Sequence, residues 1–322
     1  MPGDRNRTRN KRPRRSHRRI PEALKDDSRF EGLLDRAHYG TGTKGPAILY
    51  HYTSWEAAEN ILQTQRFWAT AHDCTNDREE LTYADHTLVA MADEFESRAT
   101  GLGRRALRTF IDTYPQHRIS ASRTTYLVCF SQKRDDPDQW REYGEHGAGV
   151  CIGLRLFGIP EPGISGIATG ILPVEYGDAR LRERLNAWHT EFTTRLEKAP
   201  DIEHNLRVSV AALQATAMAW AVTTKAPRWA PEEEVRMIFL PREGATVAYA
   251  ERQRSNGTTA KYIEVPVTRL PRMPVEEFIV GASQDVPGGI ERATRLLATK
   301  KYRRPGSRVF ASVCSAELRR PL

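Results

Sequence analysis

The sequence predicts an α+β fold, and three observations carry that prediction. Stretches of strand composition and stretches of helical periodicity follow one another without the regular alternation that a doubly wound parallel sheet requires. No expected strand is followed by a glycine-rich phosphate loop of the GxxxxGK type or by GxGxxG. The 322 residues are 39% hydrophobic and 28% charged, which suits a soluble globular protein with a sizeable core.

Hydrophobic periodicity places the expected elements along the chain. Strands are expected near 46–52, 66–70, 124–131, 149–156, 171–176, 234–240, 260–268, 276–281 and 308–313. Helices are expected near 54–64, 78–98, 102–114, 137–143, 179–197, 203–226 and 288–300. The helical stretch at about 179–226 is broken at Ala199-Pro200, and we expect it to be an insertion with its own hydrophobic face.

The first strand ends on a polar residue, His51, directly before a helix signal. Thr53-x-x-Glu56 is typical of a capping box at the start of that helix. Either His51 is hydrogen-bonded within the core, as most histidines on strands are, or it contacts a ligand at the strand end. Tyr52 points to the opposite face by strand alternation and is expected to pack.

An acidic run leads directly into the strand expected at 234–240. Side chains two apart on a strand share a face, so Glu232, Glu234 and Arg236 are predicted to lie on one side. The alternative is a solvated acidic turn. Upstream, Trp140 and Tyr143 lie three apart on a short helix, where they either pack together into the core or line a site.

The net charge of +8 belongs to the first twenty residues. Their nine basic residues, set against one acid, are Arg5, Arg7, Arg9, Lys11, Arg12, Arg14, Arg15, Arg18 and Arg19. The other 302 residues hold 40 basic and 40 acidic side chains. We therefore expect a disordered basic arm at 1–25 and a folded domain at 26–322. Such an arm binds nucleic acid through counterion release, or is a solubilising or partner-binding terminus.

Other residue patterns narrow the class of protein. Four cysteines lie far apart without a Cys-x-x-Cys pair, which indicates neither a zinc site nor a disulfide framework and favours a reducing cytoplasm. The nine histidines include no His-Glu-x-x-His, so no metal is expected. No apolar run approaches the roughly 20 residues that cross a bilayer, and the amino terminus lacks the apolar core of a secretory signal.

Taken in order, several short motifs between residues 47 and 312 resemble the bacterial DUF2971 family, which is grouped with ADP-ribosyltransferases of the His-Tyr-Glu type. They are His51-x-Thr53, Asn76-Asp77-x-x-Glu80, Cys129-Phe130-Ser131, Trp140-x-x-Tyr143-Gly144, Gly149-Val150-Cys151-Ile152-Gly153, Lys225, Glu232-x-Glu234-x-Arg236 and Ile279-Val280-Gly281. The resemblance implies two packed, mainly antiparallel sheets with helical insertions. The spacing of 91 positions from Tyr143 to Glu234 exceeds that of the better known transferases, and the helical insertion fills it.

The resemblance also implies NAD as substrate and a role for each site residue. His51 would donate hydrogen bonds to NAD, and Tyr143, or in its place Ser131, would complete the middle of the site. Glu234 would meet the ribose 2′-hydroxyl and the positive charge that develops on the ribose, while Glu232 would orient or deprotonate the acceptor. The supporting residues are Phe130 and Trp140 at the pocket wall, Arg236 pinning the carboxylates or meeting a phosphate, and Lys225 at the pyrophosphate.

The activity so implied is cleavage of the nicotinamide–ribose bond and transfer of ADP-ribose to a nucleic acid or a protein. Relatives of this fold act in toxins, toxin–antitoxin modules and phage defence, so an inhibitor or antitoxin protein is a possible partner. Two other classes stay open. An NAD glycohydrolase would use water as the acceptor, and a non-catalytic nucleic-acid-binding module would depend on the basic arm.

Overall fold

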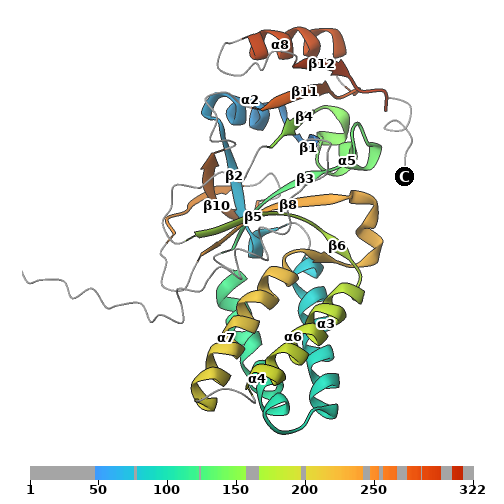
Figure 1. Ribbon diagram of the computed structural model, residues 1–322. Helices are drawn as coiled ribbons and strands as arrows, with labels where there is room; N and C mark the ends of the chain where they lie inside the picture. Colours follow the sequence, from blue (N-terminus) through green and yellow to red (C-terminus); the bar gives the residue numbers. More distant parts are fainter. Residues whose placement is uncertain are drawn as a thin grey trace, which may run out of the picture.

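The computed structural model describes residues 48–75, 78–122, 125–156, 167–196, 201–241, 247–253, 257–266, 274–283, 285–298 and 307–314. The expected basic arm at 1–25 and the Asn76-Asp77 pair lie outside these residues. Figure 1 shows a β-sheet with helices against one end and a bundle of helices on the other side. The fold is mixed α+β with a mainly antiparallel sheet, as the sequence predicts.

Ten strands form one sheet. They are β1 (Ile48–Thr53), β2 (Arg66–Ala71), β3 (Tyr126–Ser131), β4 (Val150–Arg155), β5 (Ile167–Pro173), β8 (Glu234–Pro241), β9 (Ala250–Gln253), β10 (Thr259–Pro266), β11 (Val275–Val280) and β12 (Arg308–Ala311). Within this sheet, the described pairs are antiparallel except β11 with β12. The short strands β6 (Glu175–Tyr176) and β7 (Thr224–Lys225) pair separately. The expected strands are confirmed, except that the strand expected at 171–176 is divided between β5 and β6. Strand β9 was missed, and β7 was predicted to be helical.

The ten-stranded sheet forks at β3. One edge of β3 pairs with β8 along its whole length. On the other edge, Tyr126 and Leu127 pair with β2, and Ser131 alone pairs with β1. The strands β1 and β2 therefore diverge, and each leads into its own wing of the sheet, β1-β4-β11-β12 and β2-β10-β9. The prediction of two packed sheets is wrong, because β3 joins both wings by backbone hydrogen bonds.

Seven α-helices and three 3₁₀-helices are described. The α-helices are α2 (Trp55–Thr64), α3 (Arg78–Arg98), α4 (Gly101–Ser122), α5 (Pro137–Glu142), α6 (Ala179–Leu196), α7 (Ile202–Ala221) and α8 (Val286–Ala298), and the 3₁₀-helices are η2 (His72–Cys74), η3 (Glu145–Gly147) and η4 (Pro227–Glu232). The cap of α2 is Ser54, whose hydroxyl accepts from the Ala57 N–H, and not Thr53. Thr53 is still part of β1, where it pairs with Val150.

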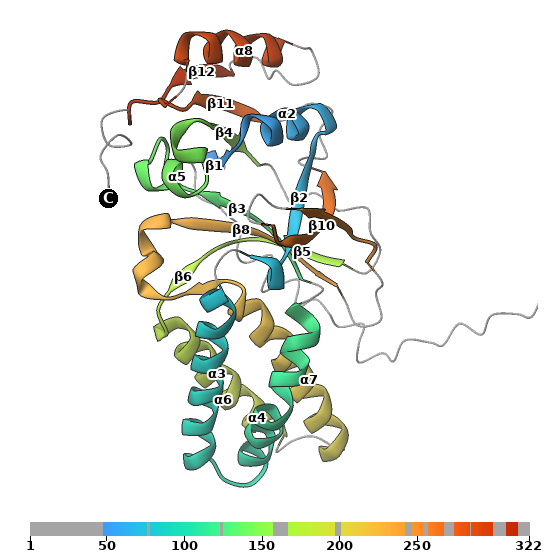
Figure 2. The same ribbon diagram turned by 180° about the vertical axis from the view of Figure 1, so that it is seen from behind.

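The two largest hydrophobic cores of the described residues lie in different parts of the molecule. One lies between the sheet and the helices α2 and α8, and it includes Phe67, Phe130, Val235 and Phe278. The other lies inside a bundle of α3, α4, α6 and α7, which Figure 2 shows packed side by side. The helices expected as an insertion at 179–226 form half of this bundle. The other half, α3 and α4, comes from the segment between β2 and β3. The four amphipathic helices pack together because each buries its apolar face against the others.

Candidate functional site

Two glutamates converge where β8 begins. Glu232 ends η4 and Glu234 is the first residue of β8, while Glu233 between them has the left-handed φ of 44°. The Nζ of Lys225 lies 2.6 Å from Glu232 Oε2 and 2.7 Å from Glu234 Oε2. The predicted convergence is found, but the strand argument for it is wrong. Glu232 belongs to a 3₁₀-helix, and the turn at Glu233 directs both side chains to one ammonium group.

Glu234 is buried and held on its other side by Arg236. The Nε of Arg236 lies 2.7 Å from Glu234 Oε1, and its Nη2 donates to Oε2 at 3.1 Å. The Nη1 of Arg236 donates to the Val222 carbonyl at the end of α7 at 2.6 Å. Arg236 therefore pins the carboxylate, which was one of its two expected roles. Its side chain is only 1% exposed, so the expected contact with a phosphate is not supported.

Lys225 also departs from its expected role. Its side chain is 4% exposed and lies between Glu232 and Glu234. An ammonium group in this place is paired with both carboxylates and reduces their mutual repulsion. Lys225 forms internal ion pairs in place of the predicted contact with the pyrophosphate of a dinucleotide. The reason is that Lys225 lies in β7, next to the turn at Glu233 that holds Glu232 and Glu234 together.

The two glutamates differ in their affinity for a proton. Burial raises the pKa of Glu234, but the charges of Arg236 and Lys225 outweigh it and lower that pKa from 4.5 to about 2. Burial raises the pKa of Glu232 above its usual range, and Lys225 only partly opposes this. Adjacent acids whose pKa values are driven apart are suited to different tasks in one site.

The lowered pKa of Glu234 predicts that the free energy of unfolding depends on pH in the acidic range. The pKa of Glu234 is lower in the folded state than in the unfolded one, so its contribution is present above pH 4.5 and is lost as the pH falls toward about 2. We expect wild type to lose about 3 kcal/mol more than Glu234→Gln over this window. Urea unfolding at several pH values measures the difference, and parallel curves for the two proteins would contradict it.

Tyr143 joins the carboxylates from the end of α5. Its hydroxyl donates to Glu232 Oε1 at 3.0 Å, and the residue is 42% exposed. Burial of the hydroxyl and the charge of Glu232 raise the pKa of Tyr143, so the group stays protonated and donates. Tyr143 therefore contacts Glu232, the neighbour of the expected Glu234, and part of its side chain faces solvent.

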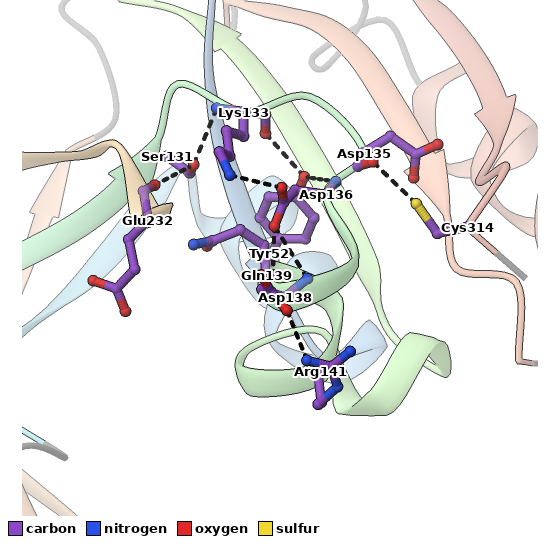
Figure 3. A network of polar contacts seen from close by, with 10 residues as sticks. All are labelled: Tyr52, Ser131, Lys133, Asp135, Asp136, Asp138, Gln139, Arg141, Glu232 and Cys314. Carbon is purple, nitrogen blue, oxygen red and sulfur yellow. Dashed lines mark hydrogen bonds and ion pairs between the residues drawn. The ribbon is translucent and has the colours of Figure 1, made fainter. Parts of the chain in front are cut away.

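Ser131 contacts the backbone of the same turn. Its hydroxyl donates to the Glu232 carbonyl at 2.7 Å and accepts from the Lys133 N–H at 3.0 Å, as Figure 3 shows. The side chain is buried and both of these partners are backbone groups. Ser131 thus positions Glu232, and the structure favours Tyr143 over Ser131 as the hydroxyl that a ligand reaches.

The aromatic residues expected at the pocket wall are both core residues. Trp140 is completely buried, lies 5.0 Å from the ring of Tyr52, and donates from Nε1 to Asp135 Oδ1 at 2.8 Å. Trp140 therefore anchors α5 to the sheet and has no exposed surface, and Tyr52 packs as predicted. Phe130 is buried against Phe67 on the other face of the sheet.

His51 lies in the fork between β1 and β2. Its Nδ1 is 2.9 Å from the carbonyl oxygen of Cys129, and its ring contacts those of Phe67 and Phe130 at 5.2 and 5.7 Å. A carbonyl only accepts, so Nδ1 carries the proton and a neutral ring leaves Nε2 as an acceptor. Burial lowers the pKa of His51, which favours the neutral ring. The structure therefore uses the N–H of His51 within the protein, and a ligand at this ring would meet an acceptor at Nε2 in place of the expected donor.

Cys129 connects His51 to the carboxylates, and the sequence did not identify it as a site residue. Its carbonyl holds His51, while its exposed thiol makes a hydrogen bond that helps to lower the pKa of Glu234. Tyr176 was also missed, and its hydroxyl accepts from the Glu234 N–H at 2.8 Å. Cys129 could have been identified only from its position opposite Arg236. That position is known only once β3 is seen to pair with β8.

Within the described ranges, no three histidine, cysteine, aspartate or glutamate side chains are arranged to hold a metal ion. Among the same residues, no helix combines the length and the apolar character needed to cross a membrane. The fold and the site together define a mixed α+β protein with a buried carboxylate and cation cluster beside a forked sheet. Comparison with family models, curated proteins and solved structures found no match.

Proposed function

We propose that this chain has an ADP-ribosyltransferase-like fold, in which the two expected sheets are joined through β3, and that it transfers ADP-ribose from NAD to a macromolecule. One observation carries the proposal. Two glutamates of different proton affinity, Glu232 and Glu234, lie together at the start of β8. Tyr143 donates to Glu232, and Cys129 contacts both Glu234 and the ring of His51 in the fork of the sheet. An ionised carboxylate suits the positive charge that develops as the leaving group departs, and a carboxylate of raised pKa suits the activation of an acceptor.

The first step of the proposed reaction breaks the bond between ribose C1′ and the nicotinamide nitrogen. The electron pair leaves with nicotinamide, and positive charge develops on the ribose. Glu234 is the negative partner for that charge, because Arg236 and Lys225 keep it ionised and fixed in place. Its side chain is only 6% exposed, so it acts through its charge and not through direct contact with the ribose. A prearranged carboxylate needs no reorganisation as the charge develops.

The second step is attack of the acceptor on C1′, with loss of a proton from the attacking group. Glu232 receives that proton, since burial raises its pKa toward the range in which a carboxylate is an effective base. Tyr143 donates to the other oxygen of the same carboxylate and so orients it. His51 accepts at Nε2 from a ribose hydroxyl or from the carboxamide of NAD.

The acceptor we propose is a nucleic acid or a protein. Nine basic residues within residues 1–20 favour a polyanion, because each phosphate contact releases counterions. A cytoplasmic effector of the toxin or phage-defence kind, restrained by an inhibitor protein, fits such an activity. Deletion of residues 1–20 should weaken labelling of nucleic acid and leave NAD turnover intact.

Label transfer tests the proposal directly. NAD labelled in its adenylate is incubated with the protein and with total RNA, single-stranded DNA or lysate protein. Label on one of these acceptors supports the transferase and identifies the acceptor class. NAD consumed without label points instead to a glycohydrolase, and intact NAD with no label points to a binding module.

Binding of NAD can be measured separately from turnover at Cys129. This thiol is exposed, whereas Cys151 and Cys314 are buried and Cys74 is intermediate. We expect NAD to slow alkylation of Cys129 several-fold, because the thiol lies beside Glu234 and its carbonyl holds His51. Peptide mass spectrometry follows the rate, with Cys74 as the internal control. Equal alkylation of Cys129 with and without NAD would argue against a nucleotide at this site.

A further inference from the structure

Lys225 has an unusual place in the carboxylate cluster. It lies in β7, two residues before η4, and its side chain is buried. Its ammonium group is within 2.7 Å of an oxygen from each of two glutamates and 5.6 Å from the ring of Trp229. One cation therefore bridges the last residue of η4 and the first residue of β8.

The two carboxylates depend on this cation to different degrees. Glu234 has a second cation, Arg236, which binds both of its oxygens. On Glu232, the described side-chain partners are Lys225 at Oε2 and the neutral hydroxyl of Tyr143 at Oε1. Lys225 is thus the cation whose contact with Glu232 the structure describes.

We propose that Lys225 is a positioning residue, whose ammonium group fixes the spacing of Glu232 and Glu234 and allows both carboxylates to be ionised side by side. Its catalytic consequence rests on the proposed function, whereas its electrostatic role is a property of the folded chain. Lys225 acts through the glutamates and need not touch NAD or the acceptor.

The surrounding charges determine which of the two carboxylates becomes protonated when the positive charge of Lys225 is removed. Two neighbouring carboxylates repel, and an opposite charge within about 4–6 Å shifts a pKa by about 1–3 pH units. Glu234 retains Arg236 and stays ionised. Glu232 is left with burial, the charge of Glu234 and the Tyr143 hydroxyl, so Glu232 takes up the proton.

Infrared titration of the carboxyl groups tests this inference without any enzymatic assay. Wild type, Lys225→Met, Lys225→Gln and Lys225→Arg are compared, with Glu232→Gln in each background to assign the band. We expect the Glu232 titration to move up by one pH unit or more in the Met and Gln variants. Lys225→Arg should restore it. Lys225→Gln keeps hydrogen-bond donors without charge and replaces Lys225→Met should that variant not fold.

Kinetics then shows whether the same charge matters for the reaction. The acidic limb of kcat/KM for NAD should move by the same amount as the infrared titration in the Met and Gln variants. An unchanged Glu232 titration in a folded variant would overturn the inference, as would a shift of Glu234 in its place. An inactive wild type would refute the proposed function alone, because the infrared result stands without turnover.

Discussion

Replacement of Glu234 by glutamine is expected to lower kcat/KM for NAD cleavage by a factor of about 10²–10³, the usual cost of removing one prearranged electrostatic partner of a transition state. Glutamine keeps the shape of the side chain and one oxygen that accepts from Arg236. The substitution removes the negative charge that meets the ribose cation in the proposed reaction. Initial rates of nicotinamide release measure the effect.

Glu233→Gln is the matched control for this prediction. Glu233 is adjacent, bears the same functional group and is exposed, so its substitution changes the net charge by the same amount. We expect its rate to remain within a factor of about two to three of wild type. A Glu234→Gln variant that keeps more than a tenth of the wild-type rate would contradict the assignment of Glu234.

Arg236→Met is expected to lower the free energy of unfolding by about 3–5 kcal/mol, the range seen when one partner of a buried ion pair is removed. Arg236 is almost completely buried and donates both to Glu234 and to the Val222 carbonyl. Methionine fills a similar volume but leaves Glu234 with one cation in place of two and Val222 without this donor. Urea unfolding at neutral pH gives the difference in free energy.

Arg295→Met is the matched control for Arg236→Met, because it removes an arginine from an exposed ion pair and not from a buried one. Arg295 pairs with Glu291 at 3.2 Å, and both side chains are largely exposed, 71% and 68%. An exposed pair contributes about 0.2–1 kcal/mol, so this variant should lose less than about 1 kcal/mol. Similar losses in the two variants would show that burial does not strengthen the pairing of Arg236.

The positions of the helices and strands were predictable from the sequence because hydrophobic periodicity is a local property. Strand β8 and helix α3, for example, begin where the pattern begins. The errors lie where local patterns compete. Lys225 continues an apolar helical pattern but lies in a short strand, and Thr53 resembles a cap but still pairs with β4.

The membership of the site was partly predictable, and its geometry was not. Glu232, Glu234 and Tyr143 were expected together and are in contact, directly or through Lys225. The link from His51 to Glu234 through Cys129 was not expected. It depends on the pairing of β3 with β8. It also depends on the fork, where β1 pairs with β3 only at Ser131 and His51 is left beside the Cys129 carbonyl.

The sequence by itself determined the fold class, the order of most of the elements and a set of candidate site residues, since these follow from local composition and spacing. Only the tertiary structure decided what each charged group meets. The left-handed turn at Glu233, the short strand that holds Lys225 and the burial of Arg236 convert expected ligand contacts into internal ion pairs. The physical reason is that the ionisation of a carboxylate depends on burial and on charges a few ångströms away, and folding alone brings those charges together.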